Sequence, residues 1–143
     1  MSQQALNSTK TLFEAYKAAL ATLEADIGPP FLQALSLIQN NSGHVVVTGM
    51  GKSGIIGRKI AATLASTGTP SLFLHPAEAI HGDLGIVRPG DVILAISYSG
   101  DTEEIIRLLP AFERLQTHLI AMTGSGDSSL AQHAEIALNI AVD

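Results

Sequence analysis

Two short loops of glycine and hydroxyl residues are the parts of this 143-residue chain whose residue types and spacing could do chemistry. The first reads Gly-Met-Gly-Lys-Ser-Gly over residues 49–54, and the second reads Ser-Tyr-Ser-Gly-Asp-Thr over residues 97–102. In each case an apolar run precedes the loop and a helical pattern follows it. Such a turn aims unpaired N–H groups and the positive end of a helix dipole at one point, which suits an anion. Both loops therefore indicate phosphate binding.

The first loop admits three interpretations. As a phosphate loop, it brings glycine backbone close to the oxygens, and Ser53 could cap the helix or bind the anion. Its literal match to G-x-G-x-x-G suggests a dinucleotide site, which requires an acidic residue at the end of the second strand. That strand ends at His75 and Pro76, and Glu78 comes too late. A Walker A loop is excluded because Val46 stands where its first glycine belongs. The third interpretation is a tight turn needed only for packing.

The second loop supplies neutral hydrogen-bond donors around a glycine. Ser97 and Ser99 lie beside Gly100, and Thr102 adds a third hydroxyl at a natural helix-capping position. Alone, such a turn is usually just a capped turn. Two such loops at the carboxyl ends of parallel strands, where open α/β sheets bind ligands, favour a phosphorylated small molecule. The residues predicted to bind it are Gly49, Gly51, Ser53, Ser97, Ser99, Gly100 and Thr102.

The elements that position these loops alternate between strand and helix patterns. Short, β-branched apolar runs are typical of parallel strands buried on both faces. They predict strands over 44–48, 71–74, 91–96, 118–122 and 136–142. Helical patterns cover 53–66, 102–115 and 128–133. Right-handed crossovers then give a three-layer α/β/α sandwich with a five-stranded parallel sheet.

Two helices are expected before this core. Residues 3–26 have apolar residues at helical spacing, and a second helix begins near Pro30 and ends within residues 40–43. We expect both to cover the core or to pack against another subunit. The start of the chain shows no signal-peptide pattern, and no apolar run approaches the ~20 residues of a membrane span. We expect one domain, with helices over 1–43 and the α/β core over 44–143.

The composition of the chain limits the kinds of partner and cofactor that it could bind. A formal net charge of −5 argues against a nucleic-acid surface, which needs a basic patch. The chain has no cysteine, which excludes disulfides, thiolate metal sites and a thiol nucleophile and suits a cytosolic protein. His75, His81 and Asp83 do not have convincing metal-ligand spacing, so we expect neither a metal nor another cofactor.

These residues closely resemble the sugar isomerase (SIS) domain, which is flavodoxin-like, and within it the D-arabinose 5-phosphate isomerase family. The match covers about residues 44–125. The Ser-x-Ser-Gly loop is shared by SIS domains generally, including sugar-phosphate sensors. Gly-Met-Gly-Lys-Ser-Gly together with His-Gly-Asp-Leu-Gly at residues 81–85 is more specific to the isomerase family. The matching segments are 45–54, 57–59, 65–70, 75–76, 81–85, 95–100 and 104–105.

The resemblance implies interconversion of D-arabinose 5-phosphate and D-ribulose 5-phosphate for Kdo synthesis in lipopolysaccharide or capsule formation. It also implies a cytoplasmic homotetramer with sites at subunit interfaces. Family members usually carry a pair of CBS domains, which this sequence lacks, and a further glutamate expected beyond Asp143. The alternatives are therefore a non-catalytic sugar-phosphate sensor or an inactive fragment of the isomerase.

Three side chains are candidates for the chemistry, both by resemblance and by type. Aldose–ketose isomerisation opens the sugar ring and moves a proton between C2 and C1 through an enediol, which requires a base, an acid or cation, and a fixed phosphate. Glu104 could be the base, or an acidic residue favoured by the helix dipole. His81 could move protons between oxygens, and Lys52 could bind phosphate or steady the enediolate. Asp83 could orient His81 or shape the turn with Gly82.

Overall fold

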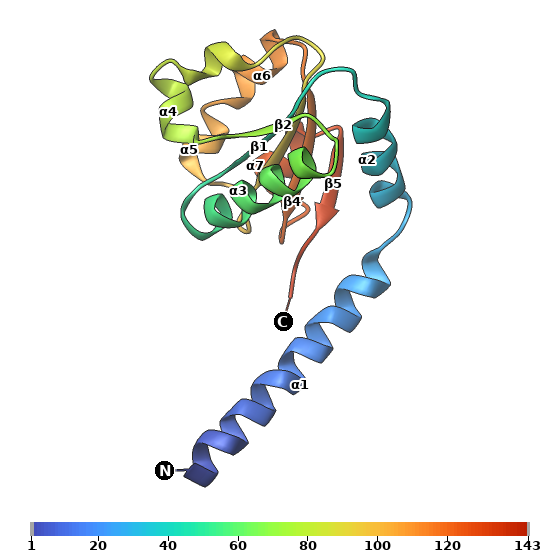
Figure 1. Ribbon diagram of the computed structural model, residues 1–143, viewed down its shortest axis with the longest axis vertical. Coiled ribbons are helices and arrows are strands. Elements are labelled where there is room, and N and C mark those ends of the chain that lie inside the picture. Colours follow the sequence, from blue (N-terminus) through green and yellow to red (C-terminus); the bar gives the residue numbers. More distant parts are fainter. Residues whose placement is uncertain (1, 143) are drawn as a thin grey trace.

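The computed structural model describes residues 2–142 and contains a five-stranded sheet within them (Figure 1). All neighbouring strands pair in parallel, and their order is β2-β1-β3-β4-β5. This is the flavodoxin-like doubly wound order. The strands are β1 (Val45–Gly49), β2 (Ser71–Leu74), β3 (Val92–Ile96), β4 (His118–Thr123) and β5 (Ile136–Asn139). The predicted five-stranded parallel α/β/α sandwich is confirmed.

The sheet forms because its central strands are apolar on both faces. Every residue of β1 and β3 is buried, whereas the edge strand β5 alternates between half-buried and exposed residues. One face packs against α2 (Pro29–Asn40) and α3 (Gly51–Ser66) through Ala34 and Ala61.

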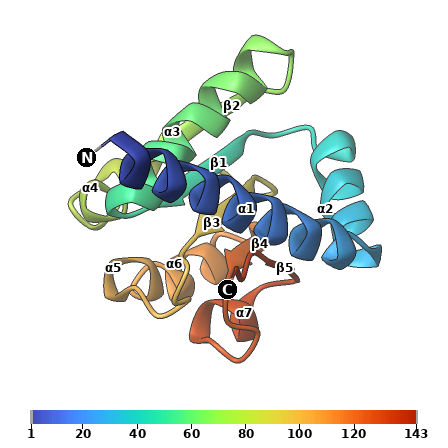
Figure 2. The same cartoon turned by 90° about the horizontal axis from the view of Figure 1, so that it is seen from below.

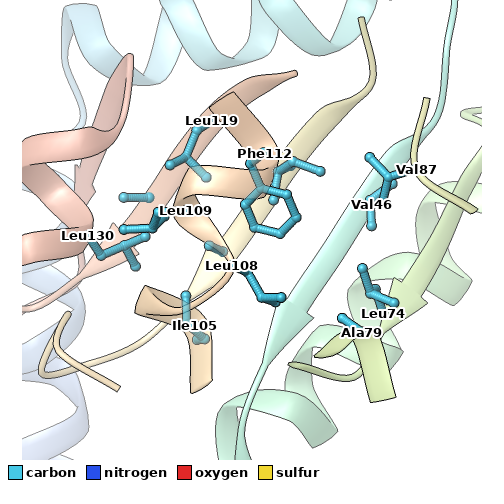
Figure 3. Close-up of a cluster of buried hydrophobic side chains, with 13 residues drawn as sticks. Val46, Leu74, Ala79, Val87, Ile105, Leu108, Leu109, Phe112, Leu119 and Leu130 are labelled. Atoms are coloured by element: carbon cyan, nitrogen blue, oxygen red, sulfur yellow. The ribbon is translucent and has the colours of Figure 1, made fainter. Parts of the chain in front are cut away.

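The other face of the sheet is covered by short helices. These are α4 (Pro76–Ile80), α5 (Glu103–Ile106), α6 (Leu109–Arg114) and α7 (Ser129–His133). Figure 3 shows the side chains that they bury against the strands, with Phe112 and Leu109 beside Leu130 and Leu119. Each such side chain contributes about 1.5–3 kcal/mol when fully buried. This packing fixes where α5 begins, and therefore where the second loop ends.

The helix α1 (Ser2–Asp26) lies apart from this core and projects away from it (Figure 1), so that in the view from below it crosses in front of the core (Figure 2). None of its residues is buried. The predicted helix is confirmed, but the expectation that it covers the core is wrong. Packing against another subunit remains a prediction. Among residues 2–142 no helix is both long enough and apolar enough to cross a membrane.

Several predicted boundaries are corrected. The helix predicted over 102–115 is interrupted between α5 and α6, because Pro110 has no N–H for a continuous helix. The segment after β2, where no helix was predicted, forms α4, with Pro76 at its first position, and then a 3₁₀ helix, Asp83–Ile86. The last strand ends at Asn139 rather than at 142.

Candidate functional site

The two loops begin side by side at the carboxyl edge of the sheet. Strands β1 and β3 are neighbours, and Gly49 is paired in register with Ile96. A Cβ atom on Gly49 would lie 3.1 Å from the Ile96 carbonyl oxygen. Since Ser97 follows Ile96, the two loops begin next to each other. The predicted convergence of the loops is therefore present.

The first loop leads directly into α3, which begins at Gly51. Gly51 has a φ of +52°, and no other atom lies within 4 Å of where its Cβ would be, so glycine serves the turn and not packing there. A Cβ on Gly54 would lie 2.6 Å from the Gly49 carbonyl oxygen, which requires glycine for close strand–helix packing. Gly51 is therefore needed for the conformation of the turn, and Gly54 for the close packing of α3 against β1.

The N-terminus of α3 leaves donors free for an anion. The first helical hydrogen bond runs from the N–H of Gly54 to the Met50 carbonyl at 3.1 Å. Within residues 2–142 the N–H groups of residues 51–53 have no protein partner. The capping residue is Met50, so the prediction that Ser53 caps this helix is wrong. Ser53 lies inside the first turn and is half-buried.

The second loop is shaped by its own hydroxyl groups. Ser97 is buried, and its Oγ accepts the N–H of Gly100 at 3.0 Å. The same Oγ lies 2.7 Å from Oγ1 of Thr102. Thr102 occupies the N-cap position of α5 as predicted, but its hydroxyl bonds to Ser97 and does not cap the helix. Ser99 is exposed, and its Oγ accepts the N–H of Asp101 at 3.3 Å.

A third loop, residues 123–128, supports the second and was not singled out from the sequence. Gly100 has a φ of +73°, and a Cβ there would lie 2.0 Å from the Ser128 Oγ. The Gly100 carbonyl accepts the N–H of Leu130 at 3.0 Å. In the sequence, the third loop is marked by a Thr-Gly-Ser-Gly-Asp-Ser run at the end of a buried strand.

Asp101 connects the second loop to the start of α7. Its Oδ1 accepts the N–H of Ser129 at 2.9 Å. Hydrogen bonds from the Ser129 side chain and then from its backbone lower the pKa of Asp101 below its usual value. The exposed carboxylate of Asp101 thus links the second loop to the first residue of α7.

The three candidate catalytic residues lie on separate elements. Lys52 is exposed at the start of α3, and Glu104 is half-buried in the first turn of α5. His81 is exposed directly after α4, which contacts α5. Among the residues that the structure describes, no hydrogen bond or ion pair joins any two of them.

Asp83 makes no hydrogen bond to His81 within the described part of the chain. It begins the 3₁₀ helix after Gly82, whose φ is +134°. Of the two predicted roles for Asp83, the geometry therefore matches shaping the turn. Residues 2–142 contain no group of three or more His, Asp or Glu side chains placed to hold a metal ion.

The sheet has the doubly wound strand order, and two small-residue loops lie at the carboxyl edge of its adjacent strands β1 and β3. These features define a class of α/β domain that binds small anionic ligands. Comparison with family models places the chain more closely, because the SIS domain matches residues 37–143. The chain belongs to the SIS domain family.

Two relatives of this chain carry the same activity in their names. Over 137 residues it is 51% identical to arabinose 5-phosphate isomerase KdsD of Pseudomonas aeruginosa, covering 96% of this chain. It is 46% identical over 136 residues to arabinose 5-phosphate isomerase KpsF of Escherichia coli, covering 94% of this chain. The chain spans only 42% of the length of each relative.

A solved structure is similar to this chain in both fold and sequence. Escherichia coli CFT073 c3406 in complex with A5P superposes with a TM-score of 0.82 at 42% identity, covering 96% of this chain and 75% of that one. The resemblance to arabinose 5-phosphate isomerases is confirmed. The role of each predicted site residue stays a prediction.

Proposed function

We propose that this chain is the SIS domain of an aldose–ketose isomerase that interconverts D-arabinose 5-phosphate and D-ribulose 5-phosphate. The observation that carries the proposal is the pair of loops, residues 49–54 and 97–102, held side by side at the ends of β1 and β3. The names of the relatives supply the substrate.

The phosphate group would be bound by neutral donors. The free N–H groups of residues 51–53 and the exposed hydroxyl of Ser99 are available to its oxygens. The only nearby cation in this loop is Lys52, and the net charge of the chain is −5. Binding therefore depends on local geometry and not on overall attraction.

The chemistry would be divided among the three candidate residues. Glu104 would remove the proton from C2 of the open-chain aldose and return it to C1 of the enediol. His81 would move the proton between the two oxygens, and Lys52 would stabilise the negative charge that develops on them. The protons balance, since one leaves C2 and one arrives at C1.

The assembly we propose is a homo-oligomer, a tetramer by family resemblance, joined through α1. Leu6, Phe13 and Leu20 repeat every seven residues and are all more than half exposed. Tyr16 and Leu23 fall at the second apolar position of the same heptads. This spacing is typical of helices that pack against helices.

Two wider expectations rest on the resemblance alone: entry of the product into Kdo synthesis, and CBS domains that follow the SIS domain in the whole protein. A third, a cytoplasmic location, is supported by the resemblance and by the absence of cysteine. Within this chain, the N-terminal helices of residues 1–43 and the core of residues 44–143 would form that single SIS domain.

A paired assay tests the proposed activity. The chain is incubated with D-arabinose 5-phosphate, D-ribulose 5-phosphate is measured, and binding is followed by calorimetry. Glu104→Gln should abolish most turnover, with a loss of about 10²–10⁴-fold, while binding remains. Glu103→Gln is the matched control, because the neighbouring carboxylate is exposed and pairs with Arg107.

Each outcome has a distinct meaning. Turnover that depends on Glu104 supports the isomerase, and binding without turnover supports a sensor or an inactive fragment. Absence of arabinose 5-phosphate binding, or tight binding of NAD, would overturn the assignment.

A further inference from the structure

Tyr98, the residue between the two serines of the second loop, is held by contacts with two separate segments. Its carbonyl oxygen accepts the N–H of Gly124 at 2.9 Å and the hydroxyl of Thr123 at 3.3 Å. Its ring lies against Gly124, where a Cβ would be only 3.0 Å from the ring. Its hydroxyl donates to the carbonyl of Val142 at 3.1 Å.

The segment after β5 is drawn to the same place. The N–H of Ile140 donates to the Thr123 carbonyl at 3.0 Å, which continues the pairing of β4 with β5. Val142 then reaches the Tyr98 hydroxyl, and its N–H lies 3.5 Å from the same oxygen. One side chain therefore joins residues 97–102 to residues 140–142, which are far apart in the sequence.

The two serines beside Tyr98 depend on this attachment to different degrees. Ser97 is buried and its N–H donates to the Met122 carbonyl at 3.1 Å, so the sheet already fixes it. Ser99 is exposed, and among the described residues it bonds only within its own loop. The contacts of Tyr98 are what hold the backbone immediately before Ser99.

We propose that Tyr98 is a positioning residue, which sets the phosphate-binding geometry of Ser99 and its neighbours by tying the loop to residues 123–128 and 140–142. This inference rests on the proposed function. Tyr98 acts through the backbone and does not itself touch the sugar. A hydrogen bond of this kind commonly changes affinity about three- to tenfold.

The test compares hydroxyl deletions at the two tyrosines of the chain. Tyr98→Phe removes the bond to Val142 and keeps the ring over Gly124. Tyr16→Phe is the matched control, because Tyr16 lies on α1, outside both loops, and phenylalanine keeps the apolar ring at its heptad position. By calorimetry, Tyr98→Phe should weaken binding of arabinose 5-phosphate and of inorganic phosphate by the same factor of about three to ten. Its unfolding midpoint should stay close to that of the wild type.

A fluorescence measurement reports on the loop directly. The chain has no tryptophan and two tyrosines, so Tyr16→Phe leaves Tyr98 as the only strong fluorophore. Because Tyr98 is fixed to the phosphate loop, its emission should change when arabinose 5-phosphate is added and saturate with the calorimetric affinity.

The outcomes separate this inference from the proposed function. If the wild type binds arabinose 5-phosphate and Tyr98→Phe binds it equally well, the positioning role is wrong. If only arabinose 5-phosphate binding weakens, and not that of phosphate, Tyr98 contacts the sugar and the inference is also wrong. If the wild type binds neither ligand, the proposed function fails and this inference fails with it.

Discussion

At the scale of single residues, the second loop separates groups that hold it in shape from groups that are free to meet a ligand. Ser97 is buried and bonds to Gly100 and Thr102, whereas Ser99 is exposed. We predict that Ser97→Ala lowers the free energy of unfolding by about 0.5–1.5 kcal/mol, because it removes the hydroxyl's bonds to Gly100 and Thr102. The Gly100 N–H keeps its bond to the Ser97 carbonyl at 3.1 Å. Ser99→Ala should weaken phosphate binding with little change in stability. Denaturant titration and calorimetry together check both, and equal effects of the two substitutions would contradict this division.

Asp101 gives the loop a dependence on pH. Its hydrogen bonds from Ser129 favour the charged form and lower its pKa, so they stabilise the fold above the usual Asp pKa of about 3.9. That stabilisation is lost as the pH falls through the lowered pKa. We predict that Asp101→Asn is less stable than the wild type at neutral pH, and that the difference shrinks in acid. Thermal unfolding between pH 7 and pH 2 measures this difference.

Asp127 provides the control for this measurement. It is an exposed carboxylate in the neighbouring loop, and within residues 2–142 only its backbone carbonyl accepts a bond, from Gln132. Asp127→Asn should show no comparable convergence with the wild type in acid. A stability difference for Asp101→Asn that stayed constant down to pH 2 would count against the role of Asp101 as a charged link.

At the scale of elements, two glycines distinguish a turn that faces open space from one that is packed. Gly51 and Gly100 both have positive φ, but only Gly100 has atoms of Ser128 where a Cβ would stand. We predict that Gly51→Ala costs about 1–2 kcal/mol of unfolding free energy, which is the strain of the left-handed conformation. Gly100→Ala adds a steric clash of about 1–3 kcal/mol. Denaturant unfolding compares them, and a smaller loss at Gly100 would refute this account.

Much of the fold can be predicted at the scale of elements, because the spacing of apolar residues indicates which residues are buried. The strand runs and the helix α3 follow from apolar residues that the sheet buries on both faces. The first two loops were found for the same reason, since each follows such a run.

What the sequence did not predict depends on contacts between distant residues. The support that residues 123–128 give to Gly100 requires strands β3 and β4 to be neighbours. The exposure of α1 is equally invisible in its amphipathic pattern, which suits a core or an interface alike. The break at Pro110 and the start of α4 at Pro76 depend on local chemistry, because proline lacks an N–H and is favoured at the start of a helix.

At the scale of the whole molecule, α1 is the feature that the single chain leaves unexplained. A helix of 25 residues is about 38 Å long, and most helical stability in proteins comes from packing an apolar face. Its apolar stripe is exposed, while its last residue, Asp26, accepts a bond from Asn139 of β5 at 2.7 Å. The base of α1 is thus attached to the core and its remainder is free to meet another copy.

Deleting residues 2–20 separates association from folding. The deletion keeps Asp26 and its bond to Asn139, and no described residue of α1 is buried. We predict that the remaining chain keeps its sheet by circular dichroism but changes from an oligomer to a monomer by light scattering. The double substitution Phe13→Glu and Leu20→Glu should do the same, since each side chain that is fully buried contributes about 1.5–3 kcal/mol to association. Thr11→Glu with Ala18→Glu is the matched charge control, because these exposed residues are also seven apart and lie outside the apolar heptad positions. A wild-type chain that is already monomeric, or a deletion that unfolds the sheet, would show that α1 is not an assembly element.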